Sequence, residues 1–398
     1  MVYDILVVGG GIHGVGIAQA AAAAGYSVLV LEQTGWASAT SSRSSKLIHG
    51  GLRYLQNGQL GLVRRCLSER RLLLELAPEL VQLNDFYIPR YRDSYYPGWQ
   101  ISLGLGLYQV LAGESPFASS HLPRHQWSQL DGLQQDQLQA VYCYRDAQTD
   151  DRLLTLAVKA SARELGANFC CPAQMVAAHI GHGSVRVDAL LNEKEVSFHA
   201  KVMINAAGPW VSHVMTRINP GLPRLPAIEL VSGSHLVLRS QLSRRCFYLQ
   251  AADRRVIFLL PWQGKTLVGT TEQPFTGEPG SVSASAEEID YLLTTVHRYF
   301  PQADLSIDET FAGVRVLPVA GGAAFSRVRE TRIYYDCPDN PKVVALYGGK
   351  LTDYRAVSEG LVDSLADRLG PSSGVSTATI SLSRTLAIRE RDNPFEMI

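Results

Sequence analysis

The first 32 residues carry a glycine pattern that constrains the fold more than any other segment. Residues 5–8 are apolar and predict a short buried strand, and Gly9, Gly11 and Gly14 follow it in a GxGxxG pattern. The first glycine permits a tight turn, the second lets the backbone approach a pyrophosphate, and the third lets a helix pack on the strand. This order predicts a dinucleotide-binding βαβ unit.

The residues after the glycines complete that unit. An alanine-rich helix is expected over about 15–24, with Gly25 as its end, and a second strand over 27–31. Glu32 follows that strand, where an acidic side chain can accept the hydroxyls of an adenosine ribose. The spacing favours a nucleotide site over a glycine-rich turn without a ligand, but it does not choose between NAD and FAD.

The segment over 40–55 favours FAD. It reads Thr-Ser-Ser-Arg-Ser-Ser-Lys-Leu-Ile-His-Gly-Gly-Leu-Arg-Tyr-Leu, where an NAD domain would normally continue with another helix and strand. A loop this rich in hydroxyl groups can line a pyrophosphate and a flavin ring. Near the other end of the chain, a buried strand over 343–347 leads into a Gly-Gly turn and a helix, whose N-terminus can stabilise negative charge on a reduced flavin.

The loop resembles the FAD-dependent, quinone-linked glycerol-3-phosphate dehydrogenase family, within the D-amino-acid-oxidase-like flavoproteins. The resemblance lies in the stretch SSKLIHGGLRYL and covers about residues 3–368. Further motifs follow in the family's order: Asn205–Trp210, Gly233–His235, Pro261-Trp262, Gly269–Thr271, Gly313–Arg315 and Gly348–Arg355. We expect a short form that lacks the family's C-terminal helical domain.

The fold class expected from this pattern is mixed α/β, with a discontinuous Rossmann-like FAD-binding domain. A substrate domain with a largely antiparallel sheet is inserted between its pieces, as alternating strands in the second half suggest. The predicted FAD-binding domain comprises 1–80, 151–225 and 341–370, the substrate domain 81–150 and 226–340, and the tail 371–398.

Composition argues against several other classes of protein. The 398 residues suffice for two or three domains, and 37 basic residues balance 37 acidic ones, so the basic excess of a nucleic-acid binder is missing. The six cysteines show no CxxC and no spacing typical of a metal site, which predicts free thiols and no metal. No stretch approaches the roughly 18 apolar residues of a membrane span, and no signal peptide is recognised, so a cytoplasmic location is expected.

The resemblance implies oxidation of sn-glycerol 3-phosphate to dihydroxyacetone phosphate by hydride transfer to flavin N5, with electrons passed on to a quinone. One alternative is a flavin oxidase or dehydrogenase of another small anionic hydroxy or amino acid. A second is a non-catalytic flavin-binding protein, and a third is an NAD-linked dehydrogenase. The acceptor, quinone or oxygen, and the oligomeric state, including a homodimer, stay open.

The resemblance also implies the site residues. His49 and Arg315 are the catalytic candidates, although His49 could equally serve only as a hydrogen-bonding group. Guanidinium groups match phosphate oxygens, so cations are expected among the substrate-binding residues, which are Arg53, Tyr54, Thr270, Arg329 and Lys350. The predicted FAD contacts are Gly9, Gly11, Gly14, Glu32, Thr40, Ser41, Ser42, Lys46, Leu47, Gly208, Gly349, Lys350, Leu351 and Thr352.

Several positions depart from the family's pattern and leave the exact substrate open. Glu272 stands where Asp is common, and Val316 where Pro usually follows the arginine. His13 stands where Asn is frequent, but we assign it no chemistry. Asp353 replaces a common Thr beside Lys350, which would place an anion near the proposed phosphate site.

Residues 86–112 suggest a membrane contact. Arg90 and Arg92 could meet anionic headgroups, aromatic rings such as Trp99 are typical of membrane interfaces, and residues 101–112 are apolar but too short to span. The alternative is a segment packed on the protein itself. The resemblance favours peripheral association with the inner face of the cytoplasmic membrane, because quinone-linked family members bind there.

Overall fold

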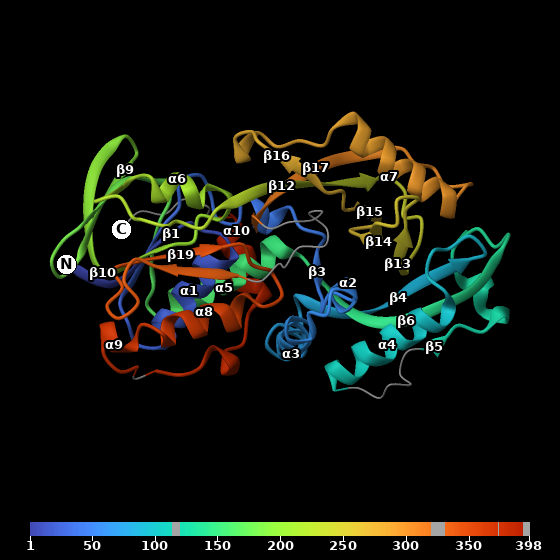
Figure 1. Cartoon of the computed structure of the whole chain (residues 1–398), viewed down its shortest axis with the longest axis horizontal. Helices are drawn as coiled ribbons and strands as arrows, with labels where there is room; N and C mark the ends of the chain where they lie inside the picture. Colours follow the sequence, from blue (N-terminus) through green and yellow to red (C-terminus); the bar gives the residue numbers. More distant parts are fainter. Residues whose placement is uncertain (114–119, 320–330, 373, 393–398) are drawn as a thin grey trace.

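A computed structural model describes residues 1–113, 120–319, 331–372 and 374–392 of the chain. Two β-sheets dominate the molecule and lie at opposite ends of its long axis (Figure 1). None of the helices in these ranges combines the length and apolar character that crossing a bilayer requires.

The first sheet has nine strands around a parallel centre. β10 pairs with β1 and β19 in parallel and with β9 antiparallel. The parallel strands, in spatial order, are β7 (Asn168–Cys170), β2 (Val28–Leu31), β1 (Val2–Val8), β10 (Lys194–Asn205) and β19 (Val343–Tyr347). The flanking strands are β8 (Ala173–Ile180), β9 (Val185–Leu191), β11 (Ile218–Asn219) and β18 (Arg332–Tyr335).

Helix α1 (Ile12–Ala23) lies buried against this sheet, between α5 (Asp151–Glu164) and α8 (Tyr354–Asp363) (Figure 1). Its small residues permit this close packing, since a Cβ at Gly16 would lie 2.7 Å from the Ser358 hydroxyl of α8. The short helices α6 (Val211–Met215) and α9 (Ala366–Leu369) follow β10 and α8. The terminal helix α10 (Arg384–Asp392) packs on α5, where the Lys159 ammonium lies 2.5 Å from the Glu390 carboxylate.

The second sheet has ten strands, and all its pairings are antiparallel except that of β13 with β4. Its strands are β3 (Leu47–Ile48), β4 (Val81–Tyr91), β5 (Ser120–His121), β6 (Leu138–Thr149), β12 (Ile228–Leu238), β13 (Cys246–Gln250), β14 (Val256–Trp262), β15 (Lys265–Gly269), β16 (Gln273–Phe275) and β17 (Ile307–Pro318). The helices beside it are α2 (Arg53–Gln56), α3 (Leu60–Leu76), α4 (Gly98–Ala112) and α7 (Ala286–Tyr299).

The predicted fold class is confirmed. β10 is one long strand, whose first half pairs with β9 and second half with β1. Helix α1 begins at Ile12, three residues before the predicted start. The helix expected after the Gly-Gly turn divides into α8 and α9.

The predicted domain boundaries stay a prediction, and the sheets divide the chain slightly differently at two strands. β3 belongs to the second sheet although it lies within 1–80, because it pairs with β6. β18 belongs to the first sheet although it lies within 226–340, because it pairs with β19.

Candidate active site

A cavity of about 770 Å³ lies where the two sheets meet, and both supply its walls. The turn after β1, the loop over 38–54 and the turn after β19 form one part of its lining. Strands β14 and β17 and the residues around Thr270 form another. Its volume is within the range of small-molecule and cofactor sites.

The glycine turn after β1 is closely packed. Gly9 adopts a φ of +112°, and a Cβ there would lie 2.7 Å from the Ala206 carbonyl oxygen. A Cβ at Gly14 would lie 1.8 Å from the Gly9 carbonyl oxygen, so Gly14 serves helix packing and is not on the cavity wall. Gly9 and Gly11 line the cavity together with the N-terminus of α1, whose N–H groups favour an anion.

Glu32 lies at the same end of the cavity, directly after β2. Its Oε2 accepts the Gly10 N–H at 2.7 Å, and its Oε1 accepts the Thr34 N–H at 2.8 Å. These backbone donors hold the carboxylate beside the glycine turn, which is the position that the sequence pattern predicts.

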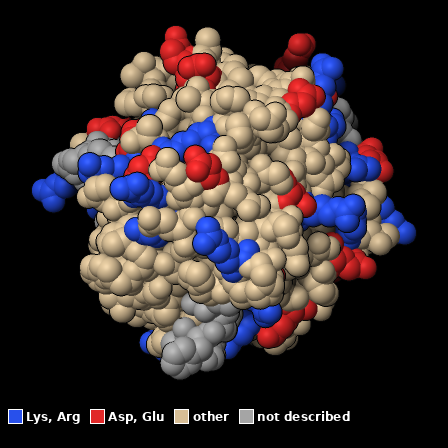
Figure 2. Space-filling view, turned by 90° about the vertical axis from the view of Figure 1, so that its right-hand side faces the viewer, with Lys and Arg blue, Asp and Glu red and all other residues tan. Residues whose placement is uncertain are grey.

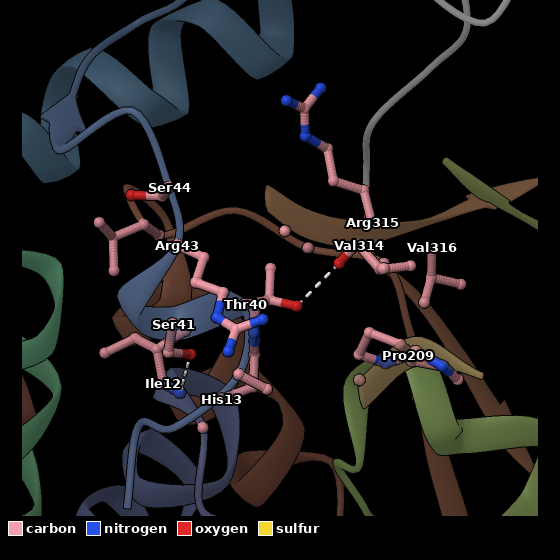
Figure 3. Close-up of a pocket in the computed structure, with 18 of the residues that line it drawn as sticks. Ile12, His13, Thr40, Ser41, Arg43, Ser44, Pro209, Val314, Arg315 and Val316 are labelled. Carbon is pink, nitrogen blue, oxygen red and sulfur yellow. Dashed lines mark hydrogen bonds between the residues drawn. The ribbon is translucent and has the colours of Figure 1, made fainter. Parts of the chain in front are cut away.

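The hydroxyl-rich loop covers α1 from the other side (Figure 3). The Ile12 N–H donates to Ser41 Oγ at 2.9 Å, and the Thr40 hydroxyl donates to the Val314 carbonyl of β17 at 2.7 Å. The loop therefore connects the first sheet's helix to the second sheet. Thr40, Ser41 and Leu47, which are predicted FAD contacts, line the cavity.

Two of the predicted FAD contacts in this loop, Ser42 and Lys46, are not on the cavity wall, and their contacts with FAD stay predictions. Lys46 is buried, and its ammonium donates to Asp151 Oδ1 at 2.5 Å and to the Ser42 carbonyl at 2.6 Å. The buried carboxylate at the start of α5 draws the ammonium inward. Neighbours that the prediction passed over line the cavity instead: Arg43, Ser44 and Ser45.

The turn after β19 forms the opposite wall. Gly349 adopts a φ of +115°, and a Cβ there would lie 2.3 Å from the His13 ring. Thr352 connects this turn to His49, which directly follows β3. Its Oγ1 accepts the His49 N–H at 3.1 Å and donates to the His49 carbonyl at 3.3 Å. Gly208, Leu351 and Thr352, which are also predicted FAD contacts, line the cavity.

His13 and Asp353 depart from the family's pattern, and both lie near this turn. His13 lines the cavity, and burial lowers the pKa of its imidazole, while the Asp353 carboxylate acts in the opposite direction. Asp353 itself is buried away from the cavity wall, where its Oδ2 accepts the Arg65 Nε–H at 3.2 Å. Asp353 thus faces Arg65 and not the cavity, although its charge still acts on His13.

The predicted substrate residues come together from distant segments. Arg53, Tyr54, Thr270, Arg315 and Lys350 all line the cavity. Arg315 Nη2 donates to Thr270 Oγ1 at 3.1 Å, and the Lys350 ammonium lies 3.7 Å from the centroid of the Tyr54 ring. In Figure 3 the Arg315 side chain extends away from the hydrogen bond between Thr40 and Val314. Arg329 lies outside the described residues.

Glu272 lies between two of these cations. Its Oε2 is 3.7 Å from Arg53 Nη1 and its Oε1 is 3.6 Å from Arg315 Nη1. The side chain is only 7% exposed, yet it lines the cavity. The sequence marked Glu272 as a departure from the family's pattern and not as a site residue.

The imidazole of His49 lines the same cavity, and its ring meets Phe258 edge-on at a centroid distance of 6.1 Å. A second histidine, His235, was not among the predicted site residues. It is buried, stacks on Phe311 at 4.8 Å, and shares a 2.9 Å hydrogen bond with the Ser45 hydroxyl. Burial lowers the pKa of His235 well below its ordinary value, so a neutral imidazole positions Ser45 on the wall.

Gly233 is another residue that was not among the predicted site residues, although both it and His235 belong to the motif Gly233–His235. A Cβ at Gly233 would lie 2.5 Å from Arg315 Nη2 and 2.6 Å from Thr270 Oγ1. The glycine therefore gives these two side chains the room to meet. The motif was the available signal for both residues.

The arrangement is suited to an anionic ligand beside a nucleotide cofactor. One end offers backbone N–H groups and glycine turns, and the other offers three cations, a histidine and two hydroxyl groups. Within the described ranges no cluster of His, Cys, Asp and Glu could hold a metal ion.

Comparison with known proteins agrees with this arrangement. The family model of FAD dependent oxidoreductases matches residues 4–355. The glycerol-3-phosphate dehydrogenase of Pseudomonas aeruginosa is 36% identical over 383 residues, which cover 93% of this chain and 73% of the relative. The D-erythritol 1-phosphate dehydrogenase of Brucella abortus is 34% identical over 363 residues, covering 89% of this chain and 72% of the relative.

A solved structure also matches most of the chain. The glycerol-3-phosphate dehydrogenase of Bacillus halodurans, complexed with FAD, superposes with a TM-score of 0.76 at 28% sequence identity. The match covers 96% of this chain and 68% of that one. The L-alpha-glycerophosphate oxidase of Mycoplasma pneumoniae, at 17% identity and a TM-score of 0.76, supports the fold alone.

Proposed function

The chain belongs to the FAD-dependent oxidoreductases, in the glycerol-3-phosphate dehydrogenase family, and from that premise we propose that it oxidises sn-glycerol 3-phosphate to dihydroxyacetone phosphate. When bound, FAD would supply the two-electron acceptor for the hydride from C2 of the substrate. The alcohol proton leaves to a base, and the electrons pass on to a quinone.

The observation that carries this proposal is the convergence of Arg53, Arg315 and Lys350 on one cavity that also holds His49. A phosphate carries close to two negative charges near neutral pH, and charge-assisted hydrogen bonds to guanidinium are among the stronger polar contacts. The three cations would bind the phosphate and leave the carbon chain beside the imidazole.

The glycine end of the cavity fits FAD. Backbone N–H groups at Gly11 and the start of α1 would bind the pyrophosphate, and Glu32 would accept the ribose hydroxyls. Gly9 and Gly349 line the cavity without a side chain, so a cofactor could approach the backbone closely there. Leu351 and Thr352 would border the flavin ring.

His49 is our candidate for the group that accepts the substrate's hydroxyl proton. A neutral imidazole suits this role near neutral pH, and Thr352 holds the His49 backbone in place through two hydrogen bonds. Thr270 would orient the reacting alcohol. If His49 only orients the substrate, its replacement by Gln would raise KM and leave kcat and the pH profile nearly unchanged.

Anaerobic flavin bleaching tests the proposal directly. The purified holoenzyme would be mixed with sn-glycerol 3-phosphate, D-erythritol 1-phosphate, glycerol or glycine, and the loss of oxidised-flavin absorption followed. We expect rapid bleaching by glycerol 3-phosphate and very slow bleaching by glycerol, which lacks the phosphate. Faster bleaching by erythritol phosphate would move the activity to a longer polyol phosphate, and bleaching by glycine alone would replace the proposal with an amino acid oxidase.

We further propose that α4 attaches the enzyme peripherally to an anionic membrane surface. One face of this helix exposes apolar side chains three or four residues apart, with Trp99 69%, Leu103 66% and Val110 55% exposed, and Leu107 between them. Figure 2 views the end of the molecule that bears α4, and much of its lower half is uncharged surface bordered by both basic and acidic side chains.

Basic residues at both ends of α4 support a lipid surface as the occupant of this face. Arg92 is exposed shortly before the helix, and the Arg71 guanidinium comes within 4.0 Å of the Cβ position at Gly113, directly after it. Apolar anchors with flanking cations are typical of interfacial helices.

Co-sedimentation with liposomes of anionic lipid tests the membrane contact. Replacing Trp99, Leu103 and Val110 together with Ser should abolish binding, whereas replacing the exposed Val176 and Val196 of the first sheet should not. Retained binding by the triple variant would contradict the proposal. A shift of the wild type to a dimer without lipid, lost in the triple variant, would assign the face to a second copy instead.

A further inference from the structure

A buried glutamate on α7 lies behind the substrate end of the cavity. Glu288 is not on the cavity wall, and its helix packs along β12 (Figure 1). Its Oε2 accepts the Ser285 N–H at 3.1 Å and the Ser234 hydroxyl at 2.9 Å, and its Oε1 accepts the Thr271 hydroxyl. One carboxylate thus joins the start of α7, strand β12 and the loop after β15.

Capping of α7 accounts for only one of these three contacts. Ser285 is the N-cap residue, and its Oγ accepts the Glu288 N–H at 3.2 Å in return, which completes a capping box. Either Glu or Gln can serve at this position of the box. The contacts of the carboxylate with the hydroxyls of Ser234 and Thr271 lie outside the box.

Thr271 connects Glu288 to the cavity wall. Its Oγ1 also accepts the Ser234 N–H at 2.8 Å, and its own N–H donates to the Ser234 carbonyl at 3.3 Å. The Thr271 carbonyl in turn accepts the Thr270 hydroxyl at 3.1 Å. Thr271 is buried, whereas Thr270 lines the cavity, so the buried residue orients the hydroxyl group on the wall.

The contacts of Thr270 determine what its hydroxyl can offer a substrate. A threonine hydroxyl has one proton and two acceptor lone pairs. The proton goes to the Thr271 carbonyl, and one lone pair accepts the Arg315 Nη2–H at 3.1 Å. The second lone pair can accept a hydrogen bond from a substrate hydroxyl in the cavity.

On the basis of the function proposed above, we propose that Glu288 is a positioning residue for the oxidation. It holds Thr271, whose carbonyl orients the Thr270 hydroxyl, and that oxygen accepts the hydrogen bond of the reacting alcohol. Glu288 itself touches neither substrate nor cofactor. Misplacement of a reacting group by about 1 Å can cost ~10²-fold in rate, so Glu288 should affect the rate of oxidation more than substrate affinity.

Glu288→Gln tests this role selectively. The amide oxygen can replace Oε2 and keep the contacts with Ser285 and Ser234, but the amide N–H2 group then faces the Thr271 hydroxyl, which loses its acceptor. Stopped-flow bleaching of the holoenzyme over a range of glycerol 3-phosphate concentrations gives the limiting rate and the dissociation constant. We expect the limiting rate to fall about tenfold to a hundredfold, and the dissociation constant to change less than about threefold.

A double-mutant cycle tests whether Glu288 acts through Thr271. Thr271→Val should slow bleaching about as much as Glu288→Gln, and the double variant should be no slower than either. Thr271→Ser keeps the hydroxyl and should restore most of the rate. Ser285→Ala is the matched control, because it removes the cap of the same helix. It should lower the unfolding temperature and leave the rate per bound FAD unchanged.

A purely structural role of Glu288 would give a different pattern. If Glu288→Gln lowered the unfolding temperature as Ser285→Ala does and left the limiting rate unchanged, the proposal would be overturned. Additive losses in the cycle would overturn it as well, because Glu288 would then act by another route. If Glu288→Gln did not fold, an unchanged rate in Thr271→Val would have the same consequence.

Failure of the proposed function is a separate result, in which glycerol 3-phosphate does not bleach the wild-type flavin. Hydrogen exchange of the substrate-free holoenzyme then tests Glu288. We expect the peptide that contains residues 269–272 to exchange faster in Glu288→Gln than in the wild type or in Ser285→Ala. Equal exchange in all three proteins would overturn the proposal.

Discussion

The two ends of the cavity are built by different means. At the nucleotide end, backbone atoms and glycines near β1, α1 and the turn after β19 form the walls. The shape of these walls depends on glycines at which a Cβ would collide with neighbouring atoms. At the substrate end, charged side chains from α2, β17 and the loop after β15 form the walls, and the contacts depend on charge balance.

The two ends should therefore tolerate different substitutions. A backbone-lined wall fails when any side chain is added, because the surrounding main chain cannot move aside. A charge-lined wall keeps its shape when a single charge is removed, but its ligand preference changes. Substitutions at the first end should therefore remove the cofactor, and substitutions at the second should leave the cofactor bound and change the substrate.

The largest effect is expected at Gly14. In Gly14→Ala the new Cβ would lie 1.8 Å from the Gly9 carbonyl oxygen, so α1 must separate from the turn. We expect loss of bound FAD and at least ~3 kcal/mol of stability, measured as flavin content and thermal unfolding. Gly360→Ala is the matched control in helix α8, where a Cβ meets nothing within 4 Å, and it should retain FAD.

The second largest effect is expected at Arg315, and it tests whether the two ends of the cavity act independently. Arg315→Ala should lower kcat/KM for glycerol 3-phosphate by about a hundredfold, or ~3 kcal/mol, because it removes a phosphate contact and leaves Glu272 facing fewer cations. Flavin content should equal that of the wild type. A variant that lost FAD and activity together would contradict the division of the cavity into two independent ends.

The nucleotide end was largely predictable from the sequence because its determinants are local. Gly9, Gly11 and Glu32 lie within 32 residues, and the helix and strands between them follow from composition. The confirmed fold class and family rest on such motifs. The side chains of the hydroxyl-rich loop were less predictable. Lys46 in this loop binds the buried Asp151 at the start of α5, and no local sequence pattern reveals that pairing.

The substrate end was predictable only through the resemblance. Arg53, Thr270 and Arg315 are far apart in the chain, and it is the pairing of β12 with β15 and β17 that brings the last two together. The direction of a side chain was not predictable either: Asp353 adjoins cavity residues, yet it turns toward Arg65 on α3. The roles of the individual residues in binding and catalysis stay predictions.

A smaller effect is expected at Tyr108, which connects α4 to the substrate end. Its hydroxyl accepts the Gly50 N–H at 2.8 Å, directly after His49, and donates to Asp146 Oδ2 at 2.7 Å. Tyr108→Phe leaves both buried partners without this bond and should cost ~1–3 kcal/mol of stability. Stopped-flow bleaching should slow modestly while FAD stays bound. An unchanged unfolding temperature would show that water or a neighbour replaces the hydroxyl.

The smallest effect concerns Cys66, which lies beneath the substrate end with its Sγ 3.9 Å from the Lys350 ammonium. A nearby cation favours the reactive thiolate, but burial outweighs it and raises the pKa of the thiol to about 12. The thiol should therefore stay protonated, and iodoacetamide at about pH 9 should modify the exposed Cys337 and spare Cys66. Peptide mass spectrometry measures both sites in one sample, and denatured protein provides the control in which both react. Modification of Cys66 in the folded holoenzyme would mean that the Lys350 charge, and not burial, governs this part of the site.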